Sequence, residues 1–314
     1  MSLYRVFIDG QAGTTGLQIR QRLALHPHIE VVTIAHQLRR DNQARRELMA
    51  AVDVTVLCLP DDAARESAQL AEDAGCRVLD ASSAHRTKPG WVFGLPELAP
   101  GQRETIASAR QVANPGCYAT GGISLLRPLI SQGLLPDDAV YCINAISGYT
   151  GGGNKLVEQY AEGGPAYSAY ALDFSHKHIP EIQTWSQLSA RPVFQPAVGN
   201  FDQGMLVFIP VVHAAGHSRD LHTALQQWYE AETFVKVQAF NEIEPTTAPM
   251  LTPHGTNGSN NIELFVLANP AYSDRTLLIA RLDNLGKGAS GAAVQNLNIM
   301  LGLPESLCTN LPVA

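Results

Sequence analysis

The sequence has little of what marks nucleic-acid-binding, membrane or exported proteins. Its 22 Lys and Arg residues are outnumbered by 29 Asp and Glu residues, which gives a formal net charge of −7. This is the wrong sign for attracting a polyanion, so we expect no nucleic-acid partner. No apolar run approaches the ~20 residues that cross a bilayer, and the first residues show no signal-peptide pattern. We therefore expect a cytoplasmic protein without a membrane partner.

Cysteine is also scarce, with five residues in the chain. The number is odd, and the spacings match neither close disulfide pairing nor a metal-ligand set. We expect free thiols in a reducing compartment and no metal site. The remaining composition, with 45% hydrophobic and 16% charged residues, is that of an ordinary globular protein. The five cysteines are Cys58, Cys76, Cys117, Cys142 and Cys308.

The chain has 314 residues, which is longer than a typical domain of ~100 to 200 residues. Its first part alternates apolar runs with helical patterns, as in a β-α-β-α-β succession. The run 54–59 is apolar throughout, which is typical of a parallel strand buried on both faces. The sequence thus predicts a dinucleotide-binding type of α/β domain at the N-terminus. The predicted strands are residues 4–9, 30–35, 53–59 and 76–80.

The pattern changes from about Pro136 onward. Longer β-rich runs follow, together with one amphipathic helix over 220–232, and they predict an antiparallel sheet with helices on one side. The segment 286–301 has helical spacing after a glycine-rich start, and we expect it to pack on the first domain. The predicted strands of this second part are residues 139–146, 205–213, 262–267 and 277–282.

A glycine-rich segment, DGQAGTTG, follows the first predicted strand at residues 9–16. Glycines at a strand-to-helix turn let backbone N–H groups approach a pyrophosphate, and the helix start adds roughly half a positive charge. The spacing G-x-x-G-x-x-G differs from the commoner G-x-G-x-x-G, and an ordinary turn is the alternative. The residues we expect at the cofactor are Gly10, Gly13, Thr14, Thr15 and Gly16.

The end of the second predicted strand bears on the choice between NAD and NADP. An acidic residue there would bind the ribose 2′-hydroxyl of NAD, but the chain has His36 followed by Arg39 and Arg40. Guanidinium groups suit a 2′-phosphate, so NADP(H) is the expected cofactor. The alternative is a solvated basic turn balanced by Asp41.

Cys117 lies in a turn that Pro115 and Gly116 impose, just ahead of a helical pattern over 120–129. A thiol near a helix start ionises more readily, and the thiolate is the nucleophile. The alternative is a small buried hydrophobic residue, which is our expectation for the other four cysteines. Cys117 is therefore the candidate nucleophile.

Four segments follow one another along the chain: FGLPEL at 93–98, NPGCY at 114–118, HKHIPE at 176–181 and GKGA at 286–289. Together and in this order they resemble the N-acetyl-gamma-glutamyl-phosphate reductases of arginine biosynthesis. The resemblance spans nearly the whole chain. The short length, the DGQAGTTG segment and GMLV at 204–207 resemble the shorter of two subfamilies.

The resemblance implies the fold of semialdehyde and glyceraldehyde-phosphate dehydrogenases. That fold is α/β, with a Rossmann-type dinucleotide-binding domain and an inserted α+β substrate domain. We place the dinucleotide-binding domain at 1–116, the catalytic and dimerisation domain at 117–284, and a returning C-terminal helix at 285–314. Family habit also implies a homo-oligomer, either a dimer or a tetramer.

The resemblance further implies an acyl-phosphate substrate that is reduced by NADPH through a thioester on Cys117. His178 is our choice for the acid/base and His176 for orienting the substrate. We expect the two rings to face opposite sides of an extended segment. Arg86 and Lys155 are candidate ligands of the phosphate or carboxylate, and a solvated role is the alternative for each.

Two more residues are expected at the cofactor. Lys287 lies in a segment that resembles a family segment touching the cofactor, although a glycine-rich entry to the last helix would have the same pattern. Ser82, after the fourth predicted strand, is the other.

Other functions remain open at this point. An aspartate-semialdehyde dehydrogenase or a lysine-pathway acyl-phosphate reductase would share the fold, and His217 is the feature that favours the former, although we expect it to be a surface histidine. A protein of another class, a non-catalytic NADP sensor, would keep the glycine-rich segment and a reactive thiol.

Overall fold

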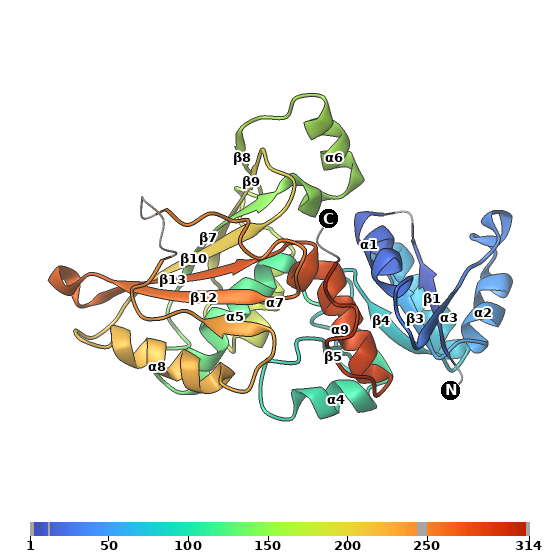
Figure 1. The fold of residues 1–314 in the computed structure, drawn as a ribbon, viewed down its shortest axis with the longest axis horizontal. Coiled ribbons are helices and arrows are strands. Elements are labelled where there is room, and N and C mark those ends of the chain that lie inside the picture. Colours follow the sequence, from blue (N-terminus) through green and yellow to red (C-terminus); the bar gives the residue numbers. More distant parts are fainter. Residues whose placement is uncertain (1–2, 12, 244–249, 312–314) are drawn as a thin grey trace. The chain divides into compact units, whose positions relative to one another are not determined.

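The computed structural model describes residues 3–11, 13–243 and 250–311 (Figure 1). It divides into two compact units, one formed by Met1–Pro115 with Ala289–Ala314 and the other by Gly116–Gly288. We call them unit 1 and unit 2. Ala12, in the glycine-rich segment, lies outside the described residues.

Unit 1 contains a six-stranded sheet in the order β2-β1-β3-β4-β6-β5, and each paired neighbour is parallel. All four residues of β3 are buried, as its continuous apolar run predicts. The predicted parallel sheet is confirmed. The strands are β1 (Tyr4–Asp9), β2 (Ile29–Val32), β3 (Val54–Leu57), β4 (Arg77–Asp80), β5 (Val92–Phe93) and β6 (Gln111–Ala113).

Helices connect these strands, since parallel neighbours need a crossover. Alanine-rich α3 buries a stripe of small residues toward the sheet, which brings the helix close to it. The carboxyl ends of the parallel strands meet at one edge, where the glycine-rich segment follows β1. The helices are α1 (Thr14–Leu23), η1 (His36–Leu38), α2 (Asn42–Ala50), α3 (Asp61–Asp73) and α4 (Gln102–Ser108).

The C-terminal helix α9 (Gly291–Met300) belongs to unit 1. Ala293, Val294 and Leu297 share one hydrophobic core with residues of β1 and α1. The fully buried Arg22 of α1 adds polar contacts, because its guanidinium donates to Ser290 Oγ at 3.2 Å and to the Thr309 carbonyl at 2.5 Å. Helix α9 is thus a structural part of the dinucleotide-type sheet domain.

Unit 2 contains a seven-stranded sheet in the order β11-β12-β13-β10-β7-β9-β8. The predicted antiparallel sheet is wrong in part: β7 pairs with β9, and β11 with β12, in parallel. The chain between β7 and β9 forms a crossover with its own helices, which a parallel pair requires. The strands are β7 (Cys142–Gly148), β8 (Tyr167–Ala169), β9 (Val193–Gly199), β10 (Met205–Val212), β11 (Val235–Val237), β12 (Ile262–Ala268) and β13 (Arg275–Leu282).

Helix α5 packs on one face of this sheet. A Cβ atom at Gly121 would lie 2.8 Å from Val207 Cγ2, so the helix approaches β10 closely. Leu206, Phe208 and Val212 alternate with Val207 and therefore point to the opposite face. The other elements are η2 (Tyr149–Gly152), η3 (Pro270–Tyr272), η4 (Gly286–Ser290) and the helices α5 (Cys117–Ser131), α6 (Asn154–Ala161), α7 (His178–Trp185) and α8 (Ser218–Tyr229).

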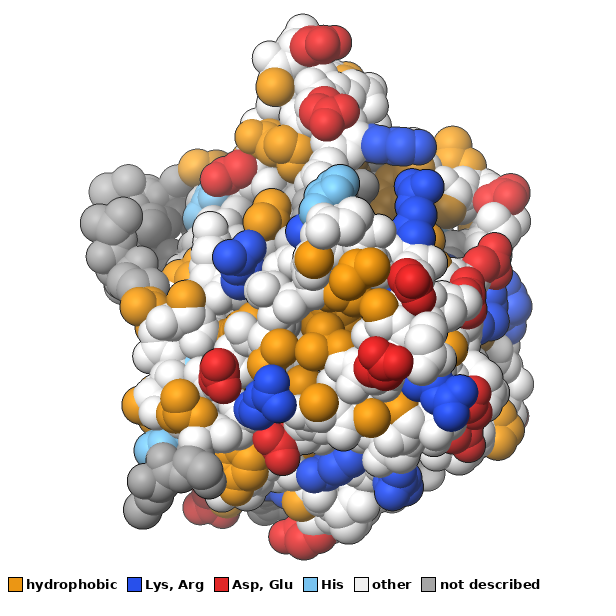
Figure 2. All heavy atoms as spheres, turned by 90° about the vertical axis from the view of Figure 1, so that its right-hand side faces the viewer, with side chains coloured by type: hydrophobic (Ala, Val, Ile, Leu, Met, Phe, Trp, Pro, Cys, Tyr) orange, Lys and Arg blue, Asp and Glu red, His pale blue; other side chains and the backbone are white. Residues whose placement is uncertain are grey.

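The surface in Figure 2 has Lys and Arg side chains interspersed with Asp and Glu side chains around a group of hydrophobic ones. This face therefore has mixed charge rather than a basic stripe. Within the described part of the chain, no helix combines the length and the apolar character that crossing a membrane requires.

Candidate active site

Cys117 is the first residue of α5, three residues earlier than the predicted start of that helix. Gly116, at the N-cap, has extended backbone angles (φ −79°, ψ 148°), which turn the chain sharply into the helix. The half-buried thiol thus lies among the first N–H groups of α5, where a negative charge is stabilised.

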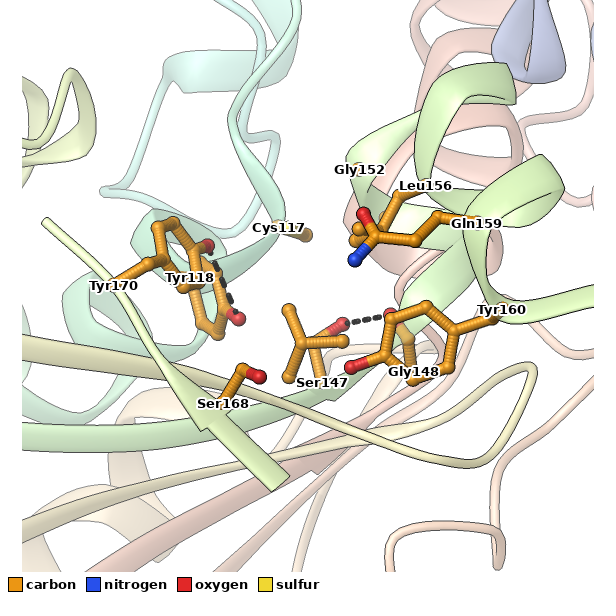
Figure 3. Close-up of a pocket in the computed structure, with 12 residues that line it drawn as sticks. Cys117, Tyr118, Ser147, Gly148, Gly152, Leu156, Gln159, Tyr160, Ser168 and Tyr170 are labelled. Atoms are coloured by element: carbon orange, nitrogen blue, oxygen red, sulfur yellow. Dashed lines mark hydrogen bonds between the residues drawn. The ribbon is translucent and has the colours of Figure 1, made fainter. Parts of the chain in front are cut away.

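A cavity of about 330 Å³ opens beside Cys117 (Figure 3). Ser147 and Gly148 of β7 form one wall, and Leu156, Gln159 and Tyr160 of α6 form another. Asp, Glu, Lys, Arg and His are all absent from the described residues that line it. The cavity therefore suits a mainly neutral group with a few polar atoms.

Two tyrosines close the cavity on the side of β8. Tyr170 Oη donates to Tyr118 Oη at 3.4 Å, and Tyr118 Oη donates to the Ala197 carbonyl at 2.9 Å. Burial raises the pKa of Tyr118 well above its usual value and that of Tyr170 to about 12. Both phenols are therefore neutral at physiological pH.

His176 and His178 lie together, and the expectation that their rings face opposite sides is wrong. Their ring centroids are 4.6 Å apart and the rings are nearly perpendicular. The segment is not extended, because α7 begins at His178 and the His178 N–H donates to His176 Nδ1 at 3.1 Å. In the neutral His176 ring the proton is therefore on Nε2.

Tyr118 links the histidines to the cavity. Its ring centroid lies 6.0 Å from that of His176 and 5.8 Å from that of His178. Neither histidine is among the described residues that line the cavity. His178 is buried and His176 is half-buried, so His176 is the more accessible of the two.

Glu181 connects α7 to the residue that precedes the nucleophile. Its buried carboxylate accepts a hydrogen bond of 2.7 Å from the Gly116 N–H. Because Glu181 and His178 are three residues apart, they lie on one side of the first turn of α7. This bond fixes the start of α7 against the start of α5, and so it positions the histidine next to the thiol-bearing helix.

Gly288 packs directly on Cys117. A Cβ atom at Gly288 would lie 2.7 Å from Cys117 Cβ, so only glycine fits without a shift of the backbone. Its neighbour Lys287 is buried, with the ammonium group 5.4 Å from the centre of the Phe234 ring. The expected contact of Lys287 with the cofactor stays a prediction.

Asp283 holds the chain that leads to Gly288. Its carboxylate accepts from the amide of Gln203 at 2.5 Å and from the N–H groups of Gly258 at 2.8 Å and Leu285 at 2.9 Å. Burial nevertheless raises the pKa of Asp283 above its usual value. Such a dense set of bonds keeps the backbone beside Cys117 in one conformation.

In unit 1 the glycines of the segment 9–16 differ in the space around them, and their expected contact with a pyrophosphate stays a prediction. Gly10 has φ +89°, and a Cβ atom there would collide with the Cys58 carbonyl. A Cβ at Gly16 would lie 2.8 Å from the Gly10 carbonyl oxygen, whereas the space at Gly13 is open. Gly10 and Gly16 thus tighten the turn, and Gly13, the N-cap of α1 ahead of Thr14 and Thr15, leaves room for a ligand.

The arginine pair after β2 is exposed. His36 opens the short helix η1, and Arg39 and Arg40 follow it. The carboxylate of Asp41 caps α2, where it accepts from the N–H groups of Gln43 at 2.9 Å and Ala44 at 3.1 Å. Both guanidinium groups are thus accessible to a ligand.

Ser82 and Arg86 follow β4, and both are buried. Ser82 Oγ donates to Asp80 at 2.7 Å, and Asp80 also binds His85 Nδ1 at 2.6 Å. The Arg86 guanidinium donates to the Asn114 carbonyl at 2.9 Å and to the Ala81 carbonyl at 3.3 Å. These contacts are structural, so the roles predicted for Ser82 at the cofactor and Arg86 at the substrate stay predictions.

The last two candidates are exposed residues of unit 2. Lys155 is in the first turn of α6, the helix that supplies three residues to the cavity, but it is not among the described lining residues. His217 lies at the N-cap of α8. The expectation that His217 is a surface histidine is confirmed.

Comparison with known proteins identifies both parts of the chain. The family model described as semialdehyde dehydrogenase, NAD binding domain, matches residues 5–109, and the one described as the dimerisation domain matches residues 117–284. An N-acetyl-gamma-glutamyl-phosphate reductase of Trichormus variabilis is 49% identical, over 98% of this chain and 99% of the relative. An N-acetyl-gamma-glutamyl-phosphate reductase of Chelativorans sp. is 47% identical, over 95% of this chain and 98% of the relative.

The chain belongs to the N-acetyl-gamma-glutamyl-phosphate reductase family. The family expected from the ordered motifs is therefore confirmed. A relative from Pseudomonas putida, 47% identical over 95% of this chain and 96% of its own length, is named N-acetyl-gamma-glutamyl-phosphate reductase 2. Unit 1 accordingly contains a nicotinamide-dinucleotide-binding domain of this family.

Solved structures show the same fold at low identity. The aspartate semialdehyde dehydrogenase of Francisella tularensis superposes with a TM-score of 0.71 at 13% identity, over 95% of this chain and 100% of that one. The aspartate semialdehyde dehydrogenase II of Vibrio cholerae, complexed with ASA, superposes with a TM-score of 0.67 at 15% identity. The match covers 96% of this chain and 99% of that one. The predicted α/β fold with a second α+β part is confirmed.

Proposed function

We propose that this chain reduces N-acetyl-gamma-glutamyl phosphate to the corresponding semialdehyde, with NADPH as reductant and release of phosphate. The observation that carries the proposal is the thiol of Cys117 at the start of α5, open to a neutral cavity. Family membership at 45–49% identity supports the substrate. The same arrangement supports an enzyme rather than a non-catalytic sensor.

In this reaction the Cys117 sulfur attacks the acyl carbon and the bond to phosphate breaks, which leaves a thioester. NADPH, when bound, supplies the hydride that reduces this thioester. Collapse of the resulting thiohemiacetal releases the aldehyde and restores the thiolate. Dividing the reaction in this way replaces one high barrier by two lower ones.

The proton transfers are assigned to His178, the first residue of α7, and to His176, which precedes that helix. We assign His178 as the acid/base and His176 as the residue that orients the substrate. Glu181 acts through them, since its bond to the Gly116 N–H holds the start of α7 beside the start of α5. The N–H groups of the first turn of α5 are suited to stabilise the oxyanion that forms at the acyl carbon. Lys155 remains a proposed ligand of the phosphate or carboxylate.

The test runs the reaction in reverse, where N-acetylglutamate semialdehyde, phosphate and NADP give NADPH absorbance. Cys117→Ser should lower kcat by at least ~10³-fold, because a hydroxyl is a far weaker nucleophile than a thiolate. Cys142→Ser is the matched control and should keep wild-type activity, because Cys142 is exposed and the expectation that it is buried is wrong. Turnover that survives in Cys117→Ser would refute the thioester route.

NADP is the proposed form of the cofactor, because Arg39 and Arg40 are exposed after β2. Replacing both by Gln should raise KM for NADP by ~10- to 100-fold, the value of one or two charge-assisted bonds to phosphate. KM for NAD should change little. Arg46→Gln, an exposed residue of α2, is the control. A wild-type preference for NAD would contradict the assignment.

A further inference from the structure

Tyr160 of α6 presents a buried hydroxyl to the Cys117 cavity. The side chain is 7% exposed, and its Oη has no hydrogen-bond partner among the residues that the structure describes. In Figure 3 this oxygen points into the cavity, toward Ser147 and Ser168. Buried hydroxyls are almost always paired, so one left open in a catalytic cavity points to a ligand atom.

The ring of Tyr160 is held in place from two sides. It stacks on the ring of Tyr149 with centroids 4.9 Å apart and an interplanar angle of 17°. A Cβ atom at Gly164 would lie 2.5 Å from Tyr160 Cδ1, so the backbone packs against the ring. The hydroxyl is therefore a preorganised group, which loses little entropy when it binds a ligand.

The residues that line the cavity indicate which kind of ligand atom the Tyr160 hydroxyl can bind. The described lining residues contain no carboxylate, so an ammonium group here would be desolvated without a counter-charge. A neutral amide has a carbonyl oxygen that can accept a hydrogen bond from the phenol, and its burial needs no counter-charge. In the same wall, the Gln159 side chain also points into the cavity and offers a carboxamide.

We propose that Tyr160 determines specificity for the N-acyl form of the substrate, with its hydroxyl donating to the acetamido carbonyl oxygen. This assignment rests on the proposed function. Tyr160 thereby acts on the end of the substrate away from the reacting carbon. It distinguishes an acylated nitrogen from a free one through a single hydrogen bond, which the acetamido carbonyl oxygen accepts and for which a free ammonium group has no acceptor.

The test compares Tyr160→Phe with wild type on two aldehydes in the reverse reaction. N-acetylglutamate semialdehyde has the amide, and 5-oxopentanoate has the same chain, aldehyde and carboxylate without it. The variant should lower kcat/KM about tenfold for the first and less than about twofold for the second. Tyr149→Phe, which removes the hydroxyl of the stacked ring, should change neither.

Inhibition gives the same comparison without turnover. N-acetylglutamate should inhibit Tyr160→Phe about tenfold more weakly than wild type, whereas inhibition by glutarate should be unchanged. Equal losses for both ligands would show a structural role and overturn the proposal, as would no loss for either. A wild-type enzyme inactive on N-acetylglutamate semialdehyde overturns the proposed function and this assignment with it, whereas activity without a Tyr160 effect overturns the assignment alone.

Discussion

Cys117 differs from the other buried or half-buried cysteines in what surrounds its sulfur. Burial, together with the carboxylates of Asp80 and Asp9, raises the pKa of Cys58 to about 12. Burial also raises the pKa of Cys76. At pH 8 about one in 10⁴ Cys58 side chains is a thiolate, so this cysteine is chemically inert. Only the position of Cys117, at the start of α5 and open to the cavity, combines access with a favourable field.

Gly288 allows a residue-scale prediction. Gly288→Ala would force a methyl group against Cys117 Cβ, so we expect kcat to fall ~10- to 100-fold through displacement of the thiol by a fraction of an ångström. The control is Gly122→Ala in α5, where the nearest atom to a new Cβ is 3.7 Å away. That variant should keep kcat and gain up to ~1 kcal/mol of helix stability. Equal activity of both variants would contradict the prediction.

The sequence indicates some of these residues and not others. Cys117 and the glycines at 10–16 lie in local patterns whose spacing follows from backbone geometry. Glu181 lies in the segment 176–181, but that segment does not indicate its role, which depends on a contact with the Gly116 N–H, far away in the chain. Tyr160 lies in no pattern that the sequence singles out. A buried hydroxyl without a partner is a property of a cavity, and one sequence without its fold gives no signal for it.

At the scale of elements, β1 to β4 of unit 1 were predicted, most plainly β3, because a strand buried on both faces has a continuous apolar run. The strands β5 and β6, with two and three residues, were not predicted. The pairing direction of strands in unit 2 was not predictable. The alternation of buried and exposed side chains in β7 and β9 is the same whether the two strands run parallel or antiparallel. The histidine pair shows the same limit. Residues 176–178 have no residue that marks a helix start, and the turn before α7 comes from the bond of the His178 N–H to His176 Nδ1.

Helix α9 gives a pH-dependent prediction through His26. The His26 ring is buried and bonds Asn298 of α9 at 3.1 Å, and burial lowers its pKa. The unfolded chain therefore takes up this proton before the folded one. The contribution of His26 to the free energy of unfolding should be constant above pH ~6.5 and decrease below it, by at most about 1.4 kcal/mol per pH unit.

Urea unfolding at pH 7.5 and 5.5 measures this effect. Wild type should lose more stability between these values than His26→Gln, which cannot take up the proton. His254→Gln, at an exposed position, is the control and should behave as wild type. If His26→Gln showed the wild-type loss, the acid sensitivity would lie elsewhere.

At the scale of the whole molecule, we expect a homo-oligomer assembled through unit 2. The family model that matches residues 117–284 is a dimerisation domain. On the sheet face opposite α5, Leu206 belongs to a hydrophobic cluster with partly buried Phe208, and Val212 further along β10 is 75% exposed. We expect a second copy to cover this face.

Sedimentation equilibrium checks this expectation. Wild type should have at least twice the 33.8 kDa mass of one chain, and Val212→Glu should weaken association by placing a charge on the apolar face. Lys236→Glu, an exposed residue of β11, is the charge control. A wild-type mass of one chain at micromolar concentration would contradict the prediction.

The contact between Gly288 and Cys117 also bears on how such a chain can arise. Unit 2 runs from Gly116 to Gly288, so its first and last residues lie beside each other. A segment with adjacent ends can be inserted into a host domain while the two host pieces still fold together. Here those pieces are residues up to Pro115 and the segment that contains α9. Unit 2 therefore begins and ends at neighbouring positions, and Cys117 directly follows its first residue, Gly116.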